Sequence, residues 1–319
     1  MSIISKDIQK AVALLNAEEL VAIPTETVYG LAGNIFSKKA INAIFETKKR
    51  PHFNPLIVHI SSLEYLDTIV EYVPEKAKLL AESFWPGPIT LVLKKKNTIP
   101  DIITAGKDTV AVRIPNHPVT LELLKQLEFP LAAPSANPFN RISPTTPQHV
   151  EDYFKYNIKM VLDGGACKNG IESTIIGFEN DEPIIYRLGS TSIEAIEKIV
   201  GKIEIKNHKE SAPVAPGMLA RHYAPKTKTV LSDNLSETIS KYSGKEIGVL
   251  SFQTEIKDRS ITFQIVLSKK GNMSEAASKL YNALHTLDRQ NLDVIIAERF
   301  PDYDLGKSIN DRLNRATKK

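Results

Sequence analysis

The segment TVAVRIPNHPVTLELLKQLEFPLAAPSANPFNRISPTT, residues 109–146, decides the fold class of this chain. It begins with an apolar, β-branched run typical of a strand, and its middle part, Pro118 to Leu127, has helical periodicity. A second short strand, Pro130 to Ala133, then enters a loop of Pro, Ser, Asn and Thr residues. Prolines hold such a loop rigid and leave its polar groups for other partners. A solvated turn would also fit, but α/β proteins place ligand contacts in loops of this kind.

The same alternation of strands and helices extends over the first two hundred residues. Ser5 and Ser37 each precede a helical pattern that their side chains can cap. Further strands are expected at residues 20–23, 55–60, 89–94, 158–163, 173–178 and 184–188, and a further helix at 147–156. So many strands with interspersed helices favour one α/β domain on a large, mixed sheet.

The composition changes near residue 203. The stretch KNHKESAPVAPGMLARHYAPKTK is rich in proline and charge and has little apolar periodicity, which is typical of a linker. Beyond it, strand patterns at 246–252 and 292–297 alternate with helical patterns at 272–289 and 307–316. We therefore divide the chain into a first domain at 1–205, a linker at 206–229 and a small C-terminal α/β domain at 230–319.

The overall composition is that of a soluble globular protein. Of the 319 residues, 42% are hydrophobic and 24% are charged, and no apolar run is long enough to span a bilayer. The start of the chain lacks the apolar core of a signal peptide. Cys167 is the only cysteine, which excludes an internal disulfide and fits a buried core residue. These features predict a cytoplasmic protein without a membrane partner, and the net charge of +4 permits an anionic ligand or RNA.

The stretch IPTETVYGLAGN, residues 23–34, places small hydroxyl groups beside glycines. Thr25 and Thr27 follow a strand, and Gly30 and Gly33 allow the backbone to approach a ligand closely. A β-turn explains the same spacing equally well. The sequence contains neither a Walker A loop nor a GxGxxG motif after a strand, so a standard nucleotide-binding loop is excluded.

Three consecutive cations end the helix that follows Ser37. Taken alone, they are best explained as charges that complement the helix dipole. However, Arg50 and Asn54 both precede prolines, which restricts their backbone to extended conformations. A stiff loop that holds Lys48, Arg50 and Asn54 would suit a polyphosphate.

Two polar residues lie inside apolar strands. His59 in PLIVHI is best explained as a hydrogen-bonded core residue, and the seven histidines form no pattern typical of a zinc site. Arg113 in TVAVRIP needs an anionic partner if it is buried, and either a ligand carboxylate or an internal Asp or Glu would serve.

A third polar group follows the strand that ends at Asp163. Gly164 and Gly165 come first, and Ser173 and Thr174 then open the next strand. Arg187 adds a cation near another strand end. Together these segments supply hydroxyl, amide and guanidinium groups without a nucleophile, a base or a carboxylate cluster. This pattern favours an enzyme that positions phosphates over an acid–base hydrolase.

These segments together resemble the YrdC-like family in its long, two-domain form. The resemblance is carried by PTETVYGLA, the stretch from Lys48 to Asn54 with PLIVHI, WPGPITLVL, VAVRIPNHP, APSANPFNRISPTT, IESTIIGF, YRLG, PGMLARHYAP and DLGKSINDRLNRA. They keep their order over nearly the whole chain. The resemblance implies a twisted, mixed-sheet α/β domain with a deep basic cavity, followed by a linker and a small Rossmann-like domain.

The resemblance also implies a reaction, in which L-threonine, bicarbonate and ATP give L-threonylcarbamoyl-AMP and pyrophosphate. The product would pass to a tRNA threonylcarbamoyl transferase, which modifies the adenosine next to certain anticodons. Mg²⁺ would be held mainly by the ATP phosphates, since the sequence offers no evident carboxylate cage. A weak contact with RNA is compatible with the mild positive charge.

Matching the family motifs to this sequence gives a set of expected site residues. The L-threonine pocket falls on Thr27, His59, Arg113, Ala133 and Ser173. The ATP contacts fall on Arg50, Asn54, Thr109, Ser135, Ser143, Arg187 and Tyr223. Lys48 and Arg50 are the expected catalytic residues, and no protein metal ligand is expected.

Two further hypotheses concern the class of protein and the linker. A carbamoyltransferase that uses carbamoyl phosphate lacks support here, because no acylphosphatase-like or zinc-finger segment is found. An RNA-binding module lacks support too, because aromatic residues make up only 7% of the chain and the cations are dispersed. The proline-flanked stretch from Ser211 to Lys226 is expected to act as a lid that brings Tyr223 to the nucleotide.

Overall fold

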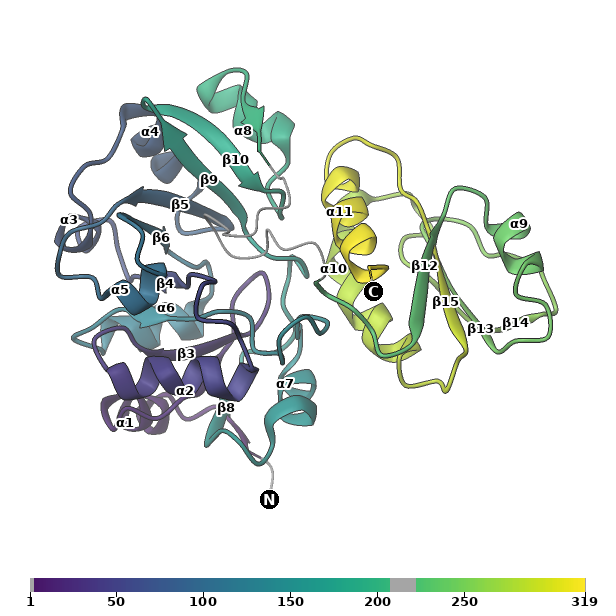
Figure 1. Ribbon diagram of the computed structural model, residues 1–319, viewed down its shortest axis with the longest axis horizontal. Helices are drawn as coiled ribbons and strands as arrows, with labels where there is room; N and C mark the ends of the chain where they lie inside the picture. The colour runs from purple at the N-terminus through teal and green to yellow at the C-terminus, as the bar shows by residue number, and fades with distance from the viewer. Residues whose placement is uncertain (1–2, 207–221, 319) are drawn as a thin grey trace.

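The structure is a computed structural model that describes residues 3–206 and 222–318. Figure 1 shows a larger lobe formed by the first part of the chain and a smaller lobe formed by the C-terminal part. Two helices of the smaller lobe, α10 (Met273–Leu287) and α11 (Gly306–Ala316), lie between its own sheet and the larger lobe. Of the expected lid, the part from Ser211 to residue 221 lies outside the described residues.

The larger lobe is built on a mixed sheet of 11 strands among the described residues. Across the sheet their order is β1-β8-β2-β3-β7-β4-β6-β5-β9-β10-β11. The strands are β1 (Ile4–Ser5), β2 (Val21–Ile23), β3 (Gly30–Asn34), β4 (Ile57–His59), β5 (Ile89–Lys94), β6 (Thr109–Arg113), β7 (Leu131–Ala132), β8 (Met160–Leu162), β9 (Thr174–Glu179), β10 (Glu182–Arg187) and β11 (Glu204–Ile205). The mixed α/β sheet predicted from the sequence is confirmed.

Helices cover both faces of this sheet. They are α1 (Ile8–Asn16), α2 (Lys38–Lys48), α3 (Leu66–Ile69), α4 (Glu75–Phe84), α5 (Asp101–Thr104), α6 (Pro118–Lys125), α7 (Pro147–Phe154) and α8 (Ile193–Val200). In β2, Val21 and Ile23 pack with α1 and α6, whereas Ala22 packs with α2. Successive strand residues point to opposite faces, so this short strand is buried on both sides.

The smaller lobe has a parallel sheet with the strand order β12-β15-β13-β14. Its strands are β12 (Lys228–Ser232), β13 (Ile247–Ser251), β14 (Ile261–Val266) and β15 (Val294–Glu298). Helices α10 and α11 pack on one face of the sheet, and α9 (Leu235–Ser240) packs on the other. Helices on both faces of a parallel sheet make the Rossmann-like arrangement that the family resemblance implied. β12 begins at Lys228, inside the range expected for the linker, and the domain boundaries themselves stay a prediction.

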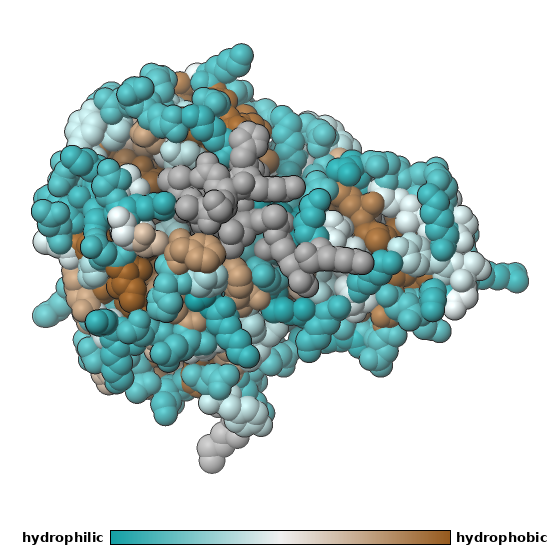
Figure 2. Space-filling view, viewed as in Figure 1, coloured by the Kyte–Doolittle hydropathy of each residue, from teal (hydrophilic) through white to brown (hydrophobic). Residues whose placement is uncertain are grey.

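The surface of the face seen in Figure 1 is mostly hydrophilic. Figure 2 shows hydrophobic residues there in small, separate areas. Among the described residues, no helix combines the length and the apolar character needed to cross a bilayer.

The structure corrects the sequence prediction at two places near the N-terminus. Ser5 lies in β1, and Asp7 is the residue that caps α1, because its side chain accepts from the backbone N–H of Lys10 at 2.9 Å. Residues 30–34 form β3, although the sequence suggested a turn or ligand loop there. Gly30 in β3 packs closely against Ala133, the residue that follows β7. A Cβ added to Gly30 would lie 3.1 Å from the Cβ of Ala133.

The correction at α1 gives a stability prediction. Asp7→Ala should lower the free energy of unfolding by about 1 kcal/mol, because it removes the acceptor for an otherwise unpaired helix N–H. Chemical unfolding followed by circular dichroism measures this loss. Ser5→Ala is the matched control and should stay within about 0.5 kcal/mol of wild type. An equal loss in both variants would show that Asp7 is not the effective cap.

Candidate active site

A cavity opens where several strands of the large sheet end or begin. Its volume is about 560 Å³, including its opening to solvent. Its lining comes from the stretches around β3, β4, β6, β7, β9 and β10, from Arg50 after α2 and from two residues of the expected linker. The lining residues are Thr25, Thr27, Val28, Gly30, Arg50, Ile57, His59, Arg113, Ala133, Pro134, Ser135, Glu172, Ser173, Arg187, His222 and Tyr223.

Strand register brings His59 and Arg113 together. β4 and β6 run parallel, and the two residues are partners across that pair. Arg113 is buried, and its Nε donates to the Gly87 carbonyl at 3.1 Å while its Nη1 donates to the Thr27 hydroxyl at 3.0 Å. The side chain is therefore held at two points, and its remaining nitrogen is Nη2.

Arg113 forms an internal ion pair. Its Nη2 lies 2.7 Å from Oε1 of Glu26, and both side chains are buried. The direction of this contact is unsuited to a hydrogen bond, and neither Glu26 oxygen nor Nη2 has a hydrogen-bond partner among the described residues. Of the two partners that the sequence left open for Arg113, the structure therefore contains the internal carboxylate, and Nη2 keeps hydrogen-bonding capacity.

His59 is a neutral side chain at the cavity wall. Burial, followed by the charge of Arg113, lowers its pKa to about 3. Its Nδ1 has no hydrogen-bond partner among the described residues. His59 can thus exchange a hydrogen bond with a ligand but does not carry a charge at neutral pH.

Two further guanidinium groups reach the cavity from other elements. Arg50 follows α2, and its Nη2 donates to the Pro55 carbonyl at 2.7 Å. Arg187 ends β10, and its Nη2 donates to the Ser173 carbonyl at 2.7 Å and to the Ser173 hydroxyl at 3.1 Å. Burial, followed by the neighbouring charge of Arg187, lowers the pKa of Arg50 to about 9. Two arginines are thus held near each other by main-chain carbonyls.

Lys48 supports the polar loop instead of lining the cavity. Its buried Nζ donates to the carbonyls of Ser135 and Asn137, at 2.5 Å each. Burial is the main cause that lowers its pKa, and the charge of Arg50 contributes. Because the donated bonds tie the end of α2 to the loop after β7, Lys48 fixes the loop that carries Ser135.

The structure brings most of the expected residues to one place. Those that line the cavity are Thr27, Arg50, His59, Arg113, Ala133, Ser135, Ser173, Arg187 and Tyr223. Those that do not line it are Lys48, Asn54, Thr109 and Ser143.

The four residues outside the lining have different surroundings. Thr109 begins β6 at the end opposite Arg113 and pairs with Lys94. The amide of Asn54 is buried without a hydrogen-bond partner among the described residues, which leaves it capacity for a ligand or water. Ser143 lies behind Glu172, a lining residue, and donates to its carboxylate at 2.6 Å.

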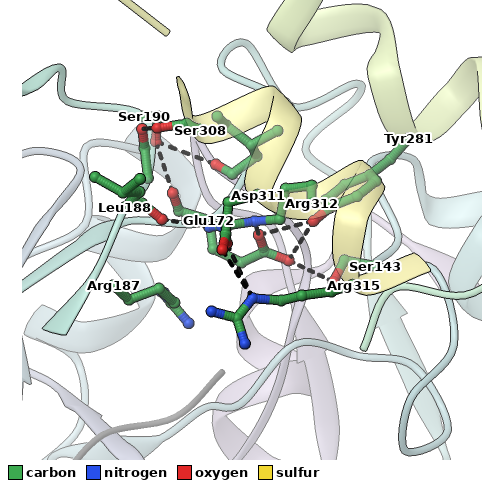
Figure 3. Close-up of polar contacts among 12 residues, drawn as sticks. Ser143, Glu172, Arg187, Leu188, Ser190, Tyr281, Ser308, Asp311, Arg312 and Arg315 are labelled. Carbon is green, nitrogen blue, oxygen red and sulfur yellow. Dashed lines mark hydrogen bonds and ion pairs between the residues drawn. The ribbon is translucent and has the colours of Figure 1, made fainter. Parts of the chain in front are cut away.

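Glu172 is a cavity residue that the sequence prediction missed. It precedes the expected Ser173, is 6% exposed, and receives hydrogen bonds from both lobes (Figure 3). Tyr281 of α10 donates to both of its oxygens, at 3.1 and 2.9 Å, and Arg312 of α11 donates to Oε2 at 2.9 Å. The only sequence signal was a carboxylate between Ile171 and Ser173 at the start of a strand, and two of its partners, Tyr281 and Arg312, lie more than a hundred residues away.

Tyr223 also contacts the smaller lobe. Its ring lies 4.9 Å from the Arg312 guanidinium and stacks on Tyr281 with a centroid distance of 5.7 Å. Its hydroxyl has no hydrogen-bond partner among the described residues. Residues from the smaller lobe therefore form a second layer behind Tyr223 and Glu172.

Comparison with known proteins agrees with this geometry. The family model of Sua5, YciO and YrdC proteins, described as "Telomere recombination", matches residues 13–189. The model described as "Threonylcarbamoyl-AMP synthase, C-terminal domain" matches residues 191–317.

Relatives with this two-part organisation align over nearly the whole chain. The threonylcarbamoyl-AMP synthase of Pyrococcus abyssi is 40% identical, with 97% of this chain and 94% of the relative covered. The synthase of Bacillus subtilis is 38% identical, with 97% and 92% covered. The crystal structure of P. abyssi Sua5 complexed with L-threonine superposes with a TM-score of 0.91, at 40% identity and with 97% and 94% of the two chains covered. The chain therefore belongs to the Sua5, YciO and YrdC family and also carries the C-terminal domain of threonylcarbamoyl-AMP synthases.

Proposed function

We propose that this chain is an L-threonylcarbamoyl-AMP synthase, which converts L-threonine, bicarbonate and ATP into L-threonylcarbamoyl-AMP and pyrophosphate. Two relatives with that name align over nearly the full length, and one homologue binds L-threonine in a crystal structure. The observation that carries the proposal is that the cavity lining contains two groups of residues in mutual contact. Arg113 lies beside His59 and Thr27 and forms the first side, and Arg50 and Arg187 lie near each other and supply the cations of the second.

The first side suits the amino acid. Arg113 Nη2 and His59 Nδ1 are buried without hydrogen-bond partners among the described residues, and Ser173 and Ala133 complete the wall. A carboxylate can take a charge-assisted hydrogen bond from Arg113, because two of the other guanidinium positions are already fixed by Gly87 and Thr27. Glu26 limits the positive charge of this side and favours a small zwitterion over a polyanion.

The second side suits the nucleotide. The main-chain acceptors of Arg50 do not neutralise this cation, so it can stabilise phosphate charge, and Arg187 adds a second cation beside it. Ser135 and Tyr223 line the same cavity, and the amide of Asn54 lies close to Arg50 in the chain. We assign these residues to ATP. Ser143 supports the cavity wall through its hydrogen bond to Glu172. Thr109 does not line the cavity, and its contact with ATP stays a prediction.

The proposed step is an in-line displacement. The threonine amine reacts with bicarbonate to form a carbamate: a nitrogen–carbon bond forms, a carbon–oxygen bond breaks, and water leaves. A carbamate oxygen then attacks the α-phosphorus of ATP, and the bond from this phosphorus to the oxygen that bridges to the β-phosphate breaks, so that pyrophosphate leaves with the electron pair. Arg50 would stabilise the charge of the phosphates, and Lys48 would act through the loop that it holds. Mg²⁺ would enter with ATP and be held mainly by its phosphates.

The cellular setting follows from the chemistry of the product. An acyl-adenylate is activated for transfer, so a tRNA threonylcarbamoyl transferase in the cytoplasm would consume it. A direct contact of this chain with RNA would be weak.

The first test of the function is the release of pyrophosphate. It should require L-threonine, bicarbonate and ATP together and should fall to background when any one is omitted. Turnover with carbamoyl phosphate in place of bicarbonate and ATP would instead favour carbamoyl transfer. RNA binding without turnover would favour an RNA-binding module.

The amino-acid side predicts the effect of Arg113→Ala. Threonine binding should weaken by about 2–5 kcal/mol, because a buried charge contact to the carboxylate is lost, while ATP binding changes much less. Calorimetric titration with each substrate measures the two effects. The double variant Glu26→Gln/Arg113→Ala removes the uncompensated carboxylate and serves as the control for folding. Unchanged threonine affinity in a folded variant would contradict the assignment.

The nucleotide side predicts a contrast between two adjacent cations. Arg50→Ala should raise the KM for ATP by roughly tenfold or more, since charge-assisted hydrogen bonds contribute about 1.5–3 kcal/mol. Lys49 is exposed and serves as the matched control. Lys49→Ala should leave KM unchanged. Steady-state pyrophosphate release measures KM, and thermal melts show whether each variant is folded. Equal KM values for the two variants would contradict the assignment of Arg50 to the ATP site.

A further inference from the structure

The carboxylate of Glu172 connects the cavity to the smaller lobe. It accepts hydrogen bonds from Ser143, Tyr281 and Arg312, which come from the loop after β7, from α10 and from α11. Figure 3 shows these donors converging on Glu172. Two of these three donors, Tyr281 and Arg312, belong to the smaller lobe, so the carboxylate is bound to that lobe although its residue lines the cavity.

Arg312 is held firmly in this position. Its side chain has no exposed surface, and Nη2 donates to the Leu188 carbonyl at 2.6 Å. Nη1 pairs with Asp311 at 2.7 Å, and the guanidinium lies 4.9 Å from the Tyr223 ring. Every part of the guanidinium therefore has a partner, and its ion pair with Glu172 is preorganised by the fold.

Glu172 also lies near the cations of the cavity. Its neighbour Ser173 binds the Arg187 guanidinium through both its carbonyl and its hydroxyl. Burial lowers the pKa of Arg187, and the charge of Glu172 opposes this shift. Burial would raise the pKa of Glu172, but the charge of Arg312, followed by that of Arg187, holds it below its ordinary value. A carboxylate beside Ser173 that lacked its own partner would neutralise Arg187 or repel an incoming phosphate.

We propose that Arg312 and Tyr281 of the C-terminal domain hold the Glu172 carboxylate away from Arg187, and that they thereby preserve the positive charge that the cavity needs for the ATP polyphosphate. Arg312 is a positioning residue, because it contacts Glu172 and Tyr223 and does not line the cavity itself. The inference rests on the proposed function, since it takes ATP as the ligand. It gives the C-terminal domain a defined role, which is to set the charge of a cavity in the other lobe.

The test compares Arg312→Met with Arg312→Met/Glu172→Gln by calorimetric titration with ATP. The single variant leaves a carboxylate without its cation and should weaken ATP binding by roughly tenfold to a hundredfold, the range of typical coupling between sites. The double variant removes the charge while keeping the shape of the side chain, and it should recover most of that loss. Threonine affinity should change much less than ATP affinity in both.

The control breaks another ion pair between the lobes. Arg289 Nη2 pairs with Asp152 Oδ2 across the same interface, with both side chains about half exposed. Arg289→Met should leave ATP affinity unchanged. If Arg312→Met does not fold in a thermal melt, Tyr281→Phe takes its place, because it removes only one donor from Glu172. It should weaken ATP binding less than tenfold, and Glu172→Gln should again recover the loss.

Two results would overturn the inference. The first is a double variant that binds ATP as poorly as its single parent, whether Arg312→Met or Tyr281→Phe. The second is an Arg289→Met variant that loses as much affinity as Arg312→Met, which would assign the effect to docking of the lobes. Both results assume that the wild type binds ATP. Failure of the wild type to bind ATP would overturn the proposed function and, with it, this inference.

Discussion

The ion pair between Glu172 and Arg312 joins the two lobes. Glu172 lines the cavity, and Arg312 lies behind it. Removing two charges from water costs several kcal/mol for each ion, and the cost is recovered only when further hydrogen bonds satisfy both partners. Here Ser143 and Tyr281 donate further hydrogen bonds to the carboxylate. The Leu188 carbonyl and the Asp311 carboxylate accept from the remaining nitrogens of the guanidinium. Because these partners come from both lobes, the lobes cannot separate without exposing a network of charges. The interface and the cavity therefore depend on the same contacts.

The arginines that line the cavity have two different kinds of partner. Arg113 has a carboxylate partner in Glu26, so the net charge of that side is small. Arg50 donates to the main-chain carbonyls of Asn54 and Pro55, which satisfy its hydrogen bonds without removing its charge. A buried arginine that donates only to carbonyls thus keeps its full charge for an anionic ligand. An arginine paired with a carboxylate has most of its charge compensated within the protein. The same side-chain type can in this way recognise an amino acid on one side and phosphates on the other.

The sequence was sufficient for the local parts of this structure. The apolar periodicity predicted α2 with its cap at Ser37, and β5 with its full length. It failed at β3, where Gly30 packs closely against Ala133 and Gly33 against Leu20 and Ala40, because glycines disfavour a strand when the segment is considered alone.

The site was predictable where the chemistry is carried by one segment and not where it depends on pairing of distant segments. Motifs located Arg50, Arg113 and Ser173, but no pattern could place Glu26 opposite Arg113 or Arg312 opposite Glu172. Those contacts are set by strand register and by docking of the smaller lobe, and neither leaves a periodic signal in the sequence. Gly170 shows how close this docking is, because an added Cβ would come within 2.3 Å of the Ser278 carbonyl oxygen in α10.

The lowered pKa of Arg50 connects stability with ligand binding. The pKa in the folded chain, about 9, lies below the ordinary value of an arginine, because of burial and the nearby charge of Arg187. A cation whose pKa is depressed by folding destabilises the fold at every pH where it is protonated in both states, which includes neutral pH. An anion that contacts Arg50 and Arg187 removes the repulsion between them and so stabilises the folded chain as it binds. The affinity of this cavity for phosphate and the cost of keeping two arginines together thus have the same physical origin.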